Sequence, residues 1–101
     1  MKVAAIIPSH NEATTIGKTI QEVKKYVDTV FAVDDGSVDN TAEIARQNGA
    51  YVIKHNMNQG IGAALQSGYD MAISKGYDYI VQLDSDGQHD PKHIPEMLGL
   101  L

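Results

Sequence analysis

Residues 3–7 read Val3-Ala4-Ala5-Ile6-Ile7, and this unbroken apolar run decides the fold. A strand with one face in water alternates apolar and polar side chains, whereas a strand covered on both faces is apolar throughout. The run therefore predicts a buried strand in a parallel sheet with helices on both faces. Pro8 follows directly, and we expect it to end the strand because proline has no N–H to donate.

Strand and helix patterns alternate along the rest of the chain. Further strands are expected over residues 29–33, 50–53 and 77–83, and helices over residues 13–26, 41–47 and 61–74. Ser37 or Asp39 is expected to cap the second helix. Parallel strands joined by helices have right-handed crossovers. We therefore predict a Rossmann-like α/β fold over residues 1–101, with three α/β/α layers and a mainly parallel sheet of strand order 3-2-1-4.

Composition excludes some classes of function. The chain has 101 residues, with 8 Lys plus Arg against 13 Asp plus Glu and no cysteine. The absence of a basic cluster argues against nucleic-acid binding, and the absence of cysteine excludes disulfides and thiolate metal sites. The acidic excess fits either a cation site or simple solubility. The first apolar run is too short for a signal or a membrane span, so we expect a cytoplasmic chain. Attachment of a longer parent protein to the cytoplasmic face of a membrane is left open.

Polar side chains follow all four expected strands. In chain order they are His10, Asn11 and Glu12; Asp34, Asp35 and Ser37; Asn56 and Asn58; and Asp84, Asp86 and Gln88. The loops after parallel strands share one edge of the sheet, and ligands bind there next to the point where the strand order reverses. We expect these four loops to form one site.

The segment Asp84-Ser85-Asp86-Gly87-Gln88 carries the sharpest chemistry. If the chain stays extended, Asp84, Asp86 and Gln88 project to one side. Two carboxylates and an amide oxygen suit Mg²⁺ or Mn²⁺, which would keep positions open for diphosphate oxygens. The plainer interpretation is a turn and helix cap.

Two other segments have alternative interpretations. Asp34 and Asp35 either form a simple turn or divide the work, one fixing the loop and the other, preferably Asp35, accepting from a base N–H or a ribose hydroxyl. Gly60 and Gly62 fit only the first half of a dinucleotide fingerprint. They could instead open a helix N-terminus toward phosphate, or let the helix start close to the sheet.

Four segments together resemble the family-2 glycosyltransferases of GT-A fold, especially the dolichol- and polyprenyl-phosphate mannose synthases. The segments are Ile7-Pro8-Ser9-His10-Asn11-Glu12, Val33-Asp34-Asp35-Gly36-Ser37-Val38-Asp39-Asn40-Thr41, Asn58-Gln59-Gly60-Ile61-Gly62-Ala63-Ala64 and Leu83-Asp84-Ser85-Asp86-Gly87-Gln88-His89-Asp90-Pro91. They cover the whole chain in the family's order. The resemblance implies the nucleotide-binding half of a GT-A fold.

The resemblance also implies a set of site residues. The nucleotide would contact Pro8, His10, Glu12, Asp34, Asp35, Asp84 and Ser85, and the metal, Mg²⁺ or Mn²⁺, would be held by Asp84, Asp86 and Gln88. The implied reaction transfers a sugar from a UDP- or GDP-sugar to an acceptor such as polyprenyl phosphate. His10 stands where these synthases often carry Tyr, and Asp90 where many carry Pro.

The family continues past this length with an acceptor-binding half, which supplies the general base of inverting enzymes. We therefore expect the chain to be the N-terminal portion of an enzyme, with that base beyond Leu101 and with nucleotide binding but little turnover of its own. The fourth strand would be an exposed edge that allows self-association. Two alternatives are a non-catalytic nucleotide-binding or regulatory module and, more distantly, a phosphoryl-transfer domain.

Overall fold

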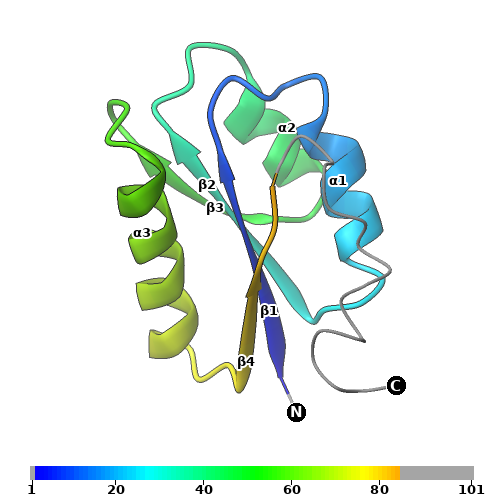
Figure 1. Ribbon diagram of the computed structural model, residues 1–101. Helices are drawn as coiled ribbons and strands as arrows, with labels where there is room; N and C mark the ends of the chain where they lie inside the picture. Colours follow the sequence, from blue (N-terminus) through cyan, green and yellow to red (C-terminus); the bar gives the residue numbers. More distant parts are fainter. Residues whose placement is uncertain (1, 85–101) are drawn as a thin grey trace.

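The computed structural model describes residues 2–84, which form a four-stranded parallel sheet between two layers of helices (Figure 1). The elements are β1 Val3–Ser9, α1 Ile16–Val23, β2 Thr29–Asp35, α2 Thr41–Gln47, β3 Tyr51–His55, α3 Ile61–Ser74 and β4 Tyr79–Gln82. The strands lie in the order β3-β2-β1-β4. Helices α1 and α2 cover one face and α3 covers the other. The expected α/β fold and strand order are confirmed.

Strand β1 is apolar throughout because both of its faces are covered. Ala5 and Ile7 belong to the core that includes side chains of α1 and α2, whereas Ala4 and Ile6 belong to the core beneath α3. All four are fully buried. Successive side chains of a strand point to opposite faces, so a buried central strand needs an apolar residue at every position.

Pro8 does not end β1, which continues to Ser9 and pairs with β2 through Pro8 and Ser9. The reason lies in the opposite neighbour. The Ile6 carbonyl accepts from Leu83 N–H on the β4 side, and the ladder with β4 ends at Ile6. Alternate residues of a strand direct their N–H groups to the same neighbouring strand, so Pro8 faces the β4 side as Ile6 does. Because the ladder with β4 ends at Ile6, the missing N–H of Pro8 would point past its end, where proline is tolerated.

Other element boundaries also differ from expectation. Helix α1 begins at Ile16 because the N–H groups of Thr15 and Ile16 both turn back onto the Glu12 carbonyl. Strand β4 begins at Tyr79 and ends at Gln82, a shorter strand than predicted. Strands β2 and β3 each run two residues further than predicted. Within the described part of the chain, no helix is long and apolar enough to span a bilayer.

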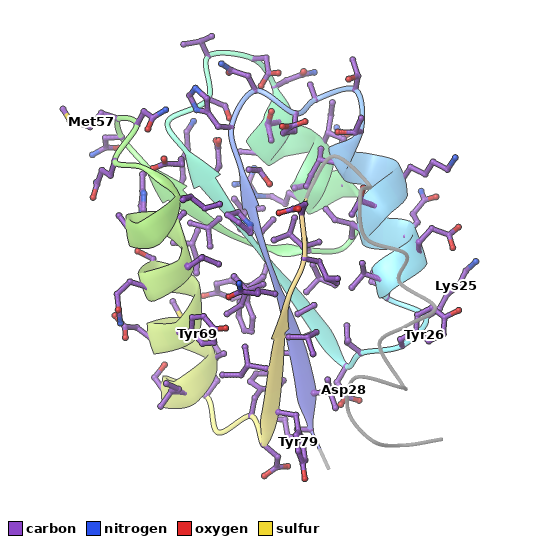
Figure 2. All side chains as sticks on the ribbon, viewed as in Figure 1. Lys25, Tyr26, Asp28, Met57, Tyr69 and Tyr79 are labelled. Atoms are coloured by element: carbon purple, nitrogen blue, oxygen red, sulfur yellow. The ribbon has the colours of Figure 1, made fainter. Side chains whose placement is uncertain are left out.

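Two aspartates hold the start of β1 from either side. Asp28 before β2 accepts from Val3 N–H at 2.7 Å, and Asp78 before β4 accepts from Lys2 N–H at 2.7 Å. Their own N–H groups donate to the carbonyls of Val3 and Lys2. Asp28 lies at the end of the sheet opposite Met57, which is in the loop after β3 (Figure 2). The amino ends of three strands are thereby tied in register.

The glycine that brings α3 close to the sheet is Gly68. A Cβ added at Gly68 would lie 2.5 Å from Ile6 Cγ2, whereas one added at Gly60 or Gly62 would meet nothing within 4 Å. The idea that Gly60 and Gly62 let the helix approach the sheet is therefore wrong. Gly60 instead has a φ of 97°, which side-chain-bearing residues rarely adopt.

Candidate functional site

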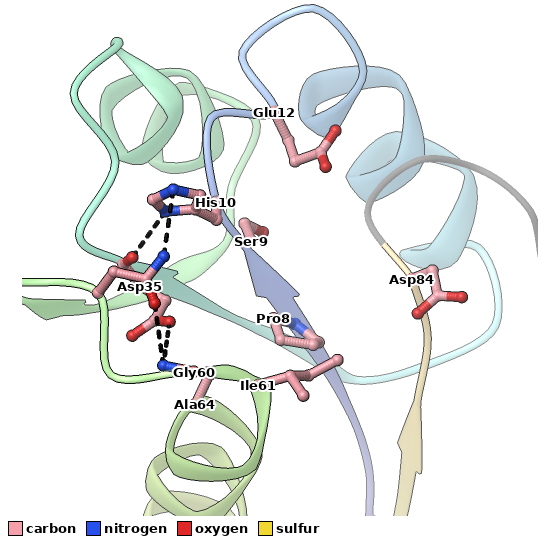
Figure 3. Close-up of a pocket in the computed structure, with 10 residues that line it drawn as sticks. Pro8, Ser9, His10, Glu12, Asp35, Gly60, Ile61, Ala64 and Asp84 are labelled. Atoms are coloured by element: carbon pink, nitrogen blue, oxygen red, sulfur yellow. Dashed lines mark hydrogen bonds between the residues drawn. The ribbon is translucent and has the colours of Figure 1, made fainter.

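A cavity of about 350 Å³ opens at the carboxyl ends of the strands (Figure 3). Its lining comes from the ends of β1, β2 and β4, the loop after β3 and the first turn of α3: Pro8, Ser9, His10, Glu12, Asp35, Asn58, Gly60, Ile61, Ala64 and Asp84. His10 and Asp35 lie on one side of the cavity, and Asp84 lies across from them. The topology thus brings four distant segments to one edge, next to the switch between β1 and β4.

The His10 ring is held by three neighbours. Its Nδ1 lies 2.8 Å from the backbone carbonyl of Asp35, which can only accept, so Nδ1 carries the proton. Its Nε2 lies 3.2 Å from the Asn58 amide nitrogen and 3.3 Å from that of Asn11. Both nitrogens donate, so Nε2 is the acceptor. The imidazole therefore joins the loops after β1, β2 and β3.

Asp35 is buried at the end of β2 and accepts three hydrogen bonds. Its Oδ1 accepts from the ring Nδ1 of His55 at 2.8 Å and from Gln59 N–H at 2.9 Å, while Oδ2 accepts from Gly60 N–H at 2.8 Å. Burial alone would raise the pKa of this carboxyl. The hydrogen bonds from Gln59, His55 and Gly60 outweigh burial and hold the pKa below 3.8, its usual value. Asp35 is therefore a fixed anion in the cavity wall.

Asp34 has a different position. Its Oδ1 accepts from Ser37 N–H at 3.1 Å, which closes the turn after β2. Asp34 is buried and does not line the cavity. The turn continues through Gly36, whose φ is 73°. A Cβ added at Gly36 would lie 2.4 Å from the backbone nitrogen of Asn58. The turn after β2 and the loop after β3 therefore touch backbone to backbone, which only glycine allows.

The loop after β1 is tied to the segment that leads into α2. Asn11 donates its N–H to Ser37 Oγ at 2.8 Å and accepts from Val38 N–H at 2.9 Å. Glu12 N–H donates to Thr41 Oγ1 at 2.9 Å. The Glu12 carboxylate lines the cavity and accepts a hydrogen bond from Thr15 at 3.1 Å.

The N-cap residue of α2 is Asn40, so the expectation of Ser37 or Asp39 as the cap is wrong. Asp39, one residue earlier, still holds the first turn of the helix. Its Oδ1 accepts from the N–H of Thr41 at 3.0 Å and from the Thr41 hydroxyl, and Oδ2 accepts from Ala13 N–H. The hydrogen bond from the Thr41 hydroxyl is the main cause that holds the pKa of Asp39 below 3.8. Asp39 thus connects the start of α2 to the loop after β1.

The expected metal ligands are only partly described. Asp84 lines the cavity, while Asp86 and Gln88 lie outside the described residues, as does Ser85, an expected nucleotide contact. Among residues 2–84, no three His, Asp or Glu side chains come together as a metal site would need. The Asp84 carboxylate is the kind of hard oxygen ligand that Mg²⁺ or Mn²⁺ prefers, but it would need further ligands. The metal site stays a prediction.

A model of the family described as "Glycosyl transferase family 2" matches residues 4–101. The chain belongs to glycosyl transferase family 2. A curated relative of this family-2 chain is the undecaprenyl-phosphate mannosyltransferase of Micrococcus luteus, which is 32% identical over 105 residues. That match covers 97% of the chain and 43% of the relative.

Two solved structures place the family-2 chain among GT-A-like synthases. Mannosyl-3-phosphoglycerate synthase from Rubrobacter xylanophilus aligns with a TM-score of 0.83 at 27% identity, over 98% of this chain and 36% of that one. Glucosyl-3-phosphoglycerate synthase from Mycobacterium tuberculosis was solved with Mn²⁺, UDP-glucose and phosphoglyceric acid. It aligns with a TM-score of 0.78 at 25% identity, over 97% of this chain and 38% of that one. The family-2 chain thus spans less than half the length of each.

Five of the expected nucleotide-binding residues line the cavity, namely Pro8, His10, Glu12, Asp35 and Asp84. Their contacts with a nucleotide stay predictions. Sequence reasoning missed Ile61 and Ala64, which supply apolar lining from α3. It also missed His55 as the partner of Asp35. A signal was present, because His55 is a polar residue that follows the apolar run 50–53 after one intervening residue, Lys54.

Proposed function

We propose that this cavity binds the nucleoside diphosphate part of a UDP- or GDP-sugar, in a protein that transfers the sugar to an acceptor. The observation that carries the proposal is the Asp35 carboxylate in the cavity wall of a family-2 chain. Among the described residues Oδ1 accepts two hydrogen bonds and Oδ2 accepts one. A carboxylate oxygen has room for two donors, so Oδ2 can accept from a base N–H or a ribose hydroxyl.

The lining also suits a sugar nucleotide. Pro8, Ile61 and Ala64 give apolar surface for a base or ribose, and Asp84 stands across the cavity from Asp35. In the proposed transfer an acceptor oxygen attacks the anomeric carbon while the bond to the diphosphate oxygen breaks, with inversion. A divalent cation, when bound by Asp84, Asp86 and Gln88, supplies charge that neutralises the departing diphosphate. Asp84 is the part of that set in the cavity wall.

The residues that would activate the acceptor are proposed to lie beyond Leu101, in an acceptor-binding half. The acceptor is proposed to be a lipid phosphate, since the relative from Micrococcus luteus is named an undecaprenyl-phosphate mannosyltransferase. A divalent metal and a UDP-sugar are favoured by the mycobacterial structure, solved with both. The alternative of a nucleotide-binding module without chemistry predicts binding but no sugar transfer by the full-length protein.

Calorimetry with UDP and GDP, with and without Mn²⁺, tests the proposal. We expect binding of one nucleotide, strengthened by Mn²⁺. Asp84→Ala should reduce the Mn²⁺-dependent part by about tenfold or more, because a charged ligand to the cation is lost. Asp70→Asn is the matched control, since Asp70 is exposed on α3, outside the cavity lining, and accepts from Gln66. Equal loss of binding in both variants, or no nucleotide binding by the chain without substitutions, would contradict the proposal.

The same assay with Asp86→Ala tests the metal assignment separately. Intact Mn²⁺-dependent binding in that variant would show the metal assignment to be wrong, while the nucleotide site would stand.

A further inference from the structure

Asp35 is the first of three side chains joined in a line that leads away from the cavity. His55 Nδ1 lies 2.8 Å from Asp35 Oδ1, and His55 Nε2 lies 2.9 Å from Ser67 Oγ. The three residues come from the end of β2, the end of β3 and the middle of α3. Neither His55 nor Ser67 lines the cavity. The line thus reaches the site only through Asp35.

We infer that His55 is a positioning residue, which fixes the Asp35 carboxylate so that Oδ2 is presented to the nucleotide, and that Ser67 fixes the His55 ring. This inference rests on the proposed function of the cavity. His55 would touch no substrate, and its effect would pass entirely through the hydrogen bond to Oδ1.

The backbone places the pair side by side. Asp35 and His55 are paired in the parallel ladder between β2 and β3, and they are the final pair at its carboxyl end. The two side chains are 7% and 10% exposed, so water competes little for their hydrogen bond. A hydrogen bond to a buried carboxylate is among the stronger ones in proteins.

The chemistry of the neighbours decides which ring nitrogen carries the proton. The Asp35 carboxylate is a fixed anion that already receives the N–H groups of Gln59 and Gly60. It can only accept, so His55 Nδ1 must be the donor. Ser67 can then donate to a bare Nε2 or accept from a protonated one, and either arrangement holds the ring plane.

A nucleophilic triad is the other interpretation of an Asp-His-Ser line. Such a triad needs the serine oxygen where a substrate can reach it. Ser67 is absent from the lining of the described cavity, whereas Asp35 at the opposite end of the line is part of it. Of the two ends of this hydrogen-bonded series, the Asp35 end, and not the Ser67 hydroxyl, lies at the cavity. That arrangement supports binding through Asp35.

Two substitutions separate positioning from simple packing. The amide nitrogen of an asparagine can take the place of Nδ1, and that of a glutamine the place of Nε2. His55→Asn therefore keeps the donor to Asp35 and gives up Ser67, whereas His55→Gln does the reverse. Loss of packing would affect both variants alike, and loss of the Asp35 donor would affect only His55→Gln.

Calorimetry of the full-length protein with UDP and GDP in the presence of Mn²⁺ gives the first measurement. We expect His55→Asn to bind within about threefold of the parent and His55→Gln to bind about tenfold more weakly, the size expected for a hydrogen bond to a charged group. Equal affinities of the two variants would overturn the inference.

Nuclear magnetic resonance of the same proteins gives a second measurement that needs no nucleotide. The parent should show a proton on His55 Nδ1, and a bare Nδ1 would overturn the inference even if both variants failed to fold. The carboxyl carbon of Asp35 should titrate at higher pH in His55→Gln than in His55→Asn. If the parent bound neither nucleotide but passed these tests, the proposed function would fail while the contact between His55 and Asp35 stood.

Discussion

At the scale of single residues, the site is organised around carboxylates whose roles are set by their donors. Asp34 closes its own turn through Ser37, and Asp39 accepts from the first N–H of α2. Asp35 does two things at once, because it holds the loop after β3 through Gln59 and Gly60 and also lines the cavity. A simple division between a structural and a binding aspartate therefore does not describe this turn.

Replacement of Asp35 by Asn should change how stability depends on pH. The pKa of Asp35 is lowered in the folded chain, so its ionised form adds stability above the unfolded pKa of 3.8, which is lost as the pH falls through the lower folded value. We expect Asp35→Asn to cost about 1–3 kcal/mol near neutral pH, because an asparagine amide has a single acceptor oxygen and its NH2 group would face a hydrogen-bond donor. The cost should shrink in acid.

Urea unfolding from about pH 7 down to about pH 2 would check this prediction. Asp70→Asn serves again as the control and should leave the difference from the parent small at every pH. A cost for Asp35→Asn that stays constant into strong acid would show that the lowered pKa does not contribute to stability.

At the scale of elements, α3 is positioned by a glycine in its middle and not by those at its start. Gly68 is buried against Ile6 of the central strand, while Gly62 is exposed in the first turn. Because α3 also supplies Ile61 and Ala64 to the cavity, and Gly60 immediately precedes it, the distance of α3 from β1 sets the width of that side of the site. The two glycines form a matched pair on one helix.

Gly68→Ala should destabilise the fold, and Gly62→Ala should not. The new methyl group at position 68 would lie 2.5 Å from Ile6 Cγ2, a branched group in a packed strand that has little room to move. Overpacking of about 1–3 kcal/mol exceeds the gain of about 1 kcal/mol from higher helix propensity. Gly62→Ala meets open space and should stabilise by about 0.5 kcal/mol. Thermal unfolding of the two variants should move in opposite directions.

At the scale of the whole molecule, β4 is an edge strand of the sheet that residues 2–84 form. Leu83 and Tyr79 point their N–H groups toward β1, where they donate to Ile6 and Lys2. Successive residues of a strand direct their N–H groups to opposite sides, so the N–H of Gln82, next to Leu83, points away from β1. Such a row of outward groups can pair with another chain.

The 101-residue chain should therefore self-associate through β4, and Gln82→Pro should weaken the association. Proline removes the outward donor at a position where an edge strand tolerates it. Static light scattering over a range of concentrations would measure the effect, with Gln66→Ala on the exposed face of α3 as the control. A parent chain that stays monomeric at high concentration would contradict the prediction.

The sequence was sufficient for the order of the sheet and for most of the cavity lining, because periodicity and strand ends are local signals. It was not sufficient for Pro8, whose acceptance in β1 depends on where the ladder with β4 stops. It also did not reveal the partner of Asp35, because pairing with His55 depends on the register between β2 and β3. Gly68 was missed because its need for a small residue arises only from contact with Ile6.

The central position of β1 has a consequence for how the chain acquires its fold during synthesis. β1 is made first, yet one of its two neighbours, β4, is made after three helices and two strands have emerged, and the contact between Lys2 and Asp78 spans 76 positions. Contacts of such separation form late and slow the search for the native state. Until β4 emerges, one edge of β1 remains open to wrong partners, and that interval is when a nascent chain of this topology most needs protection from aggregation.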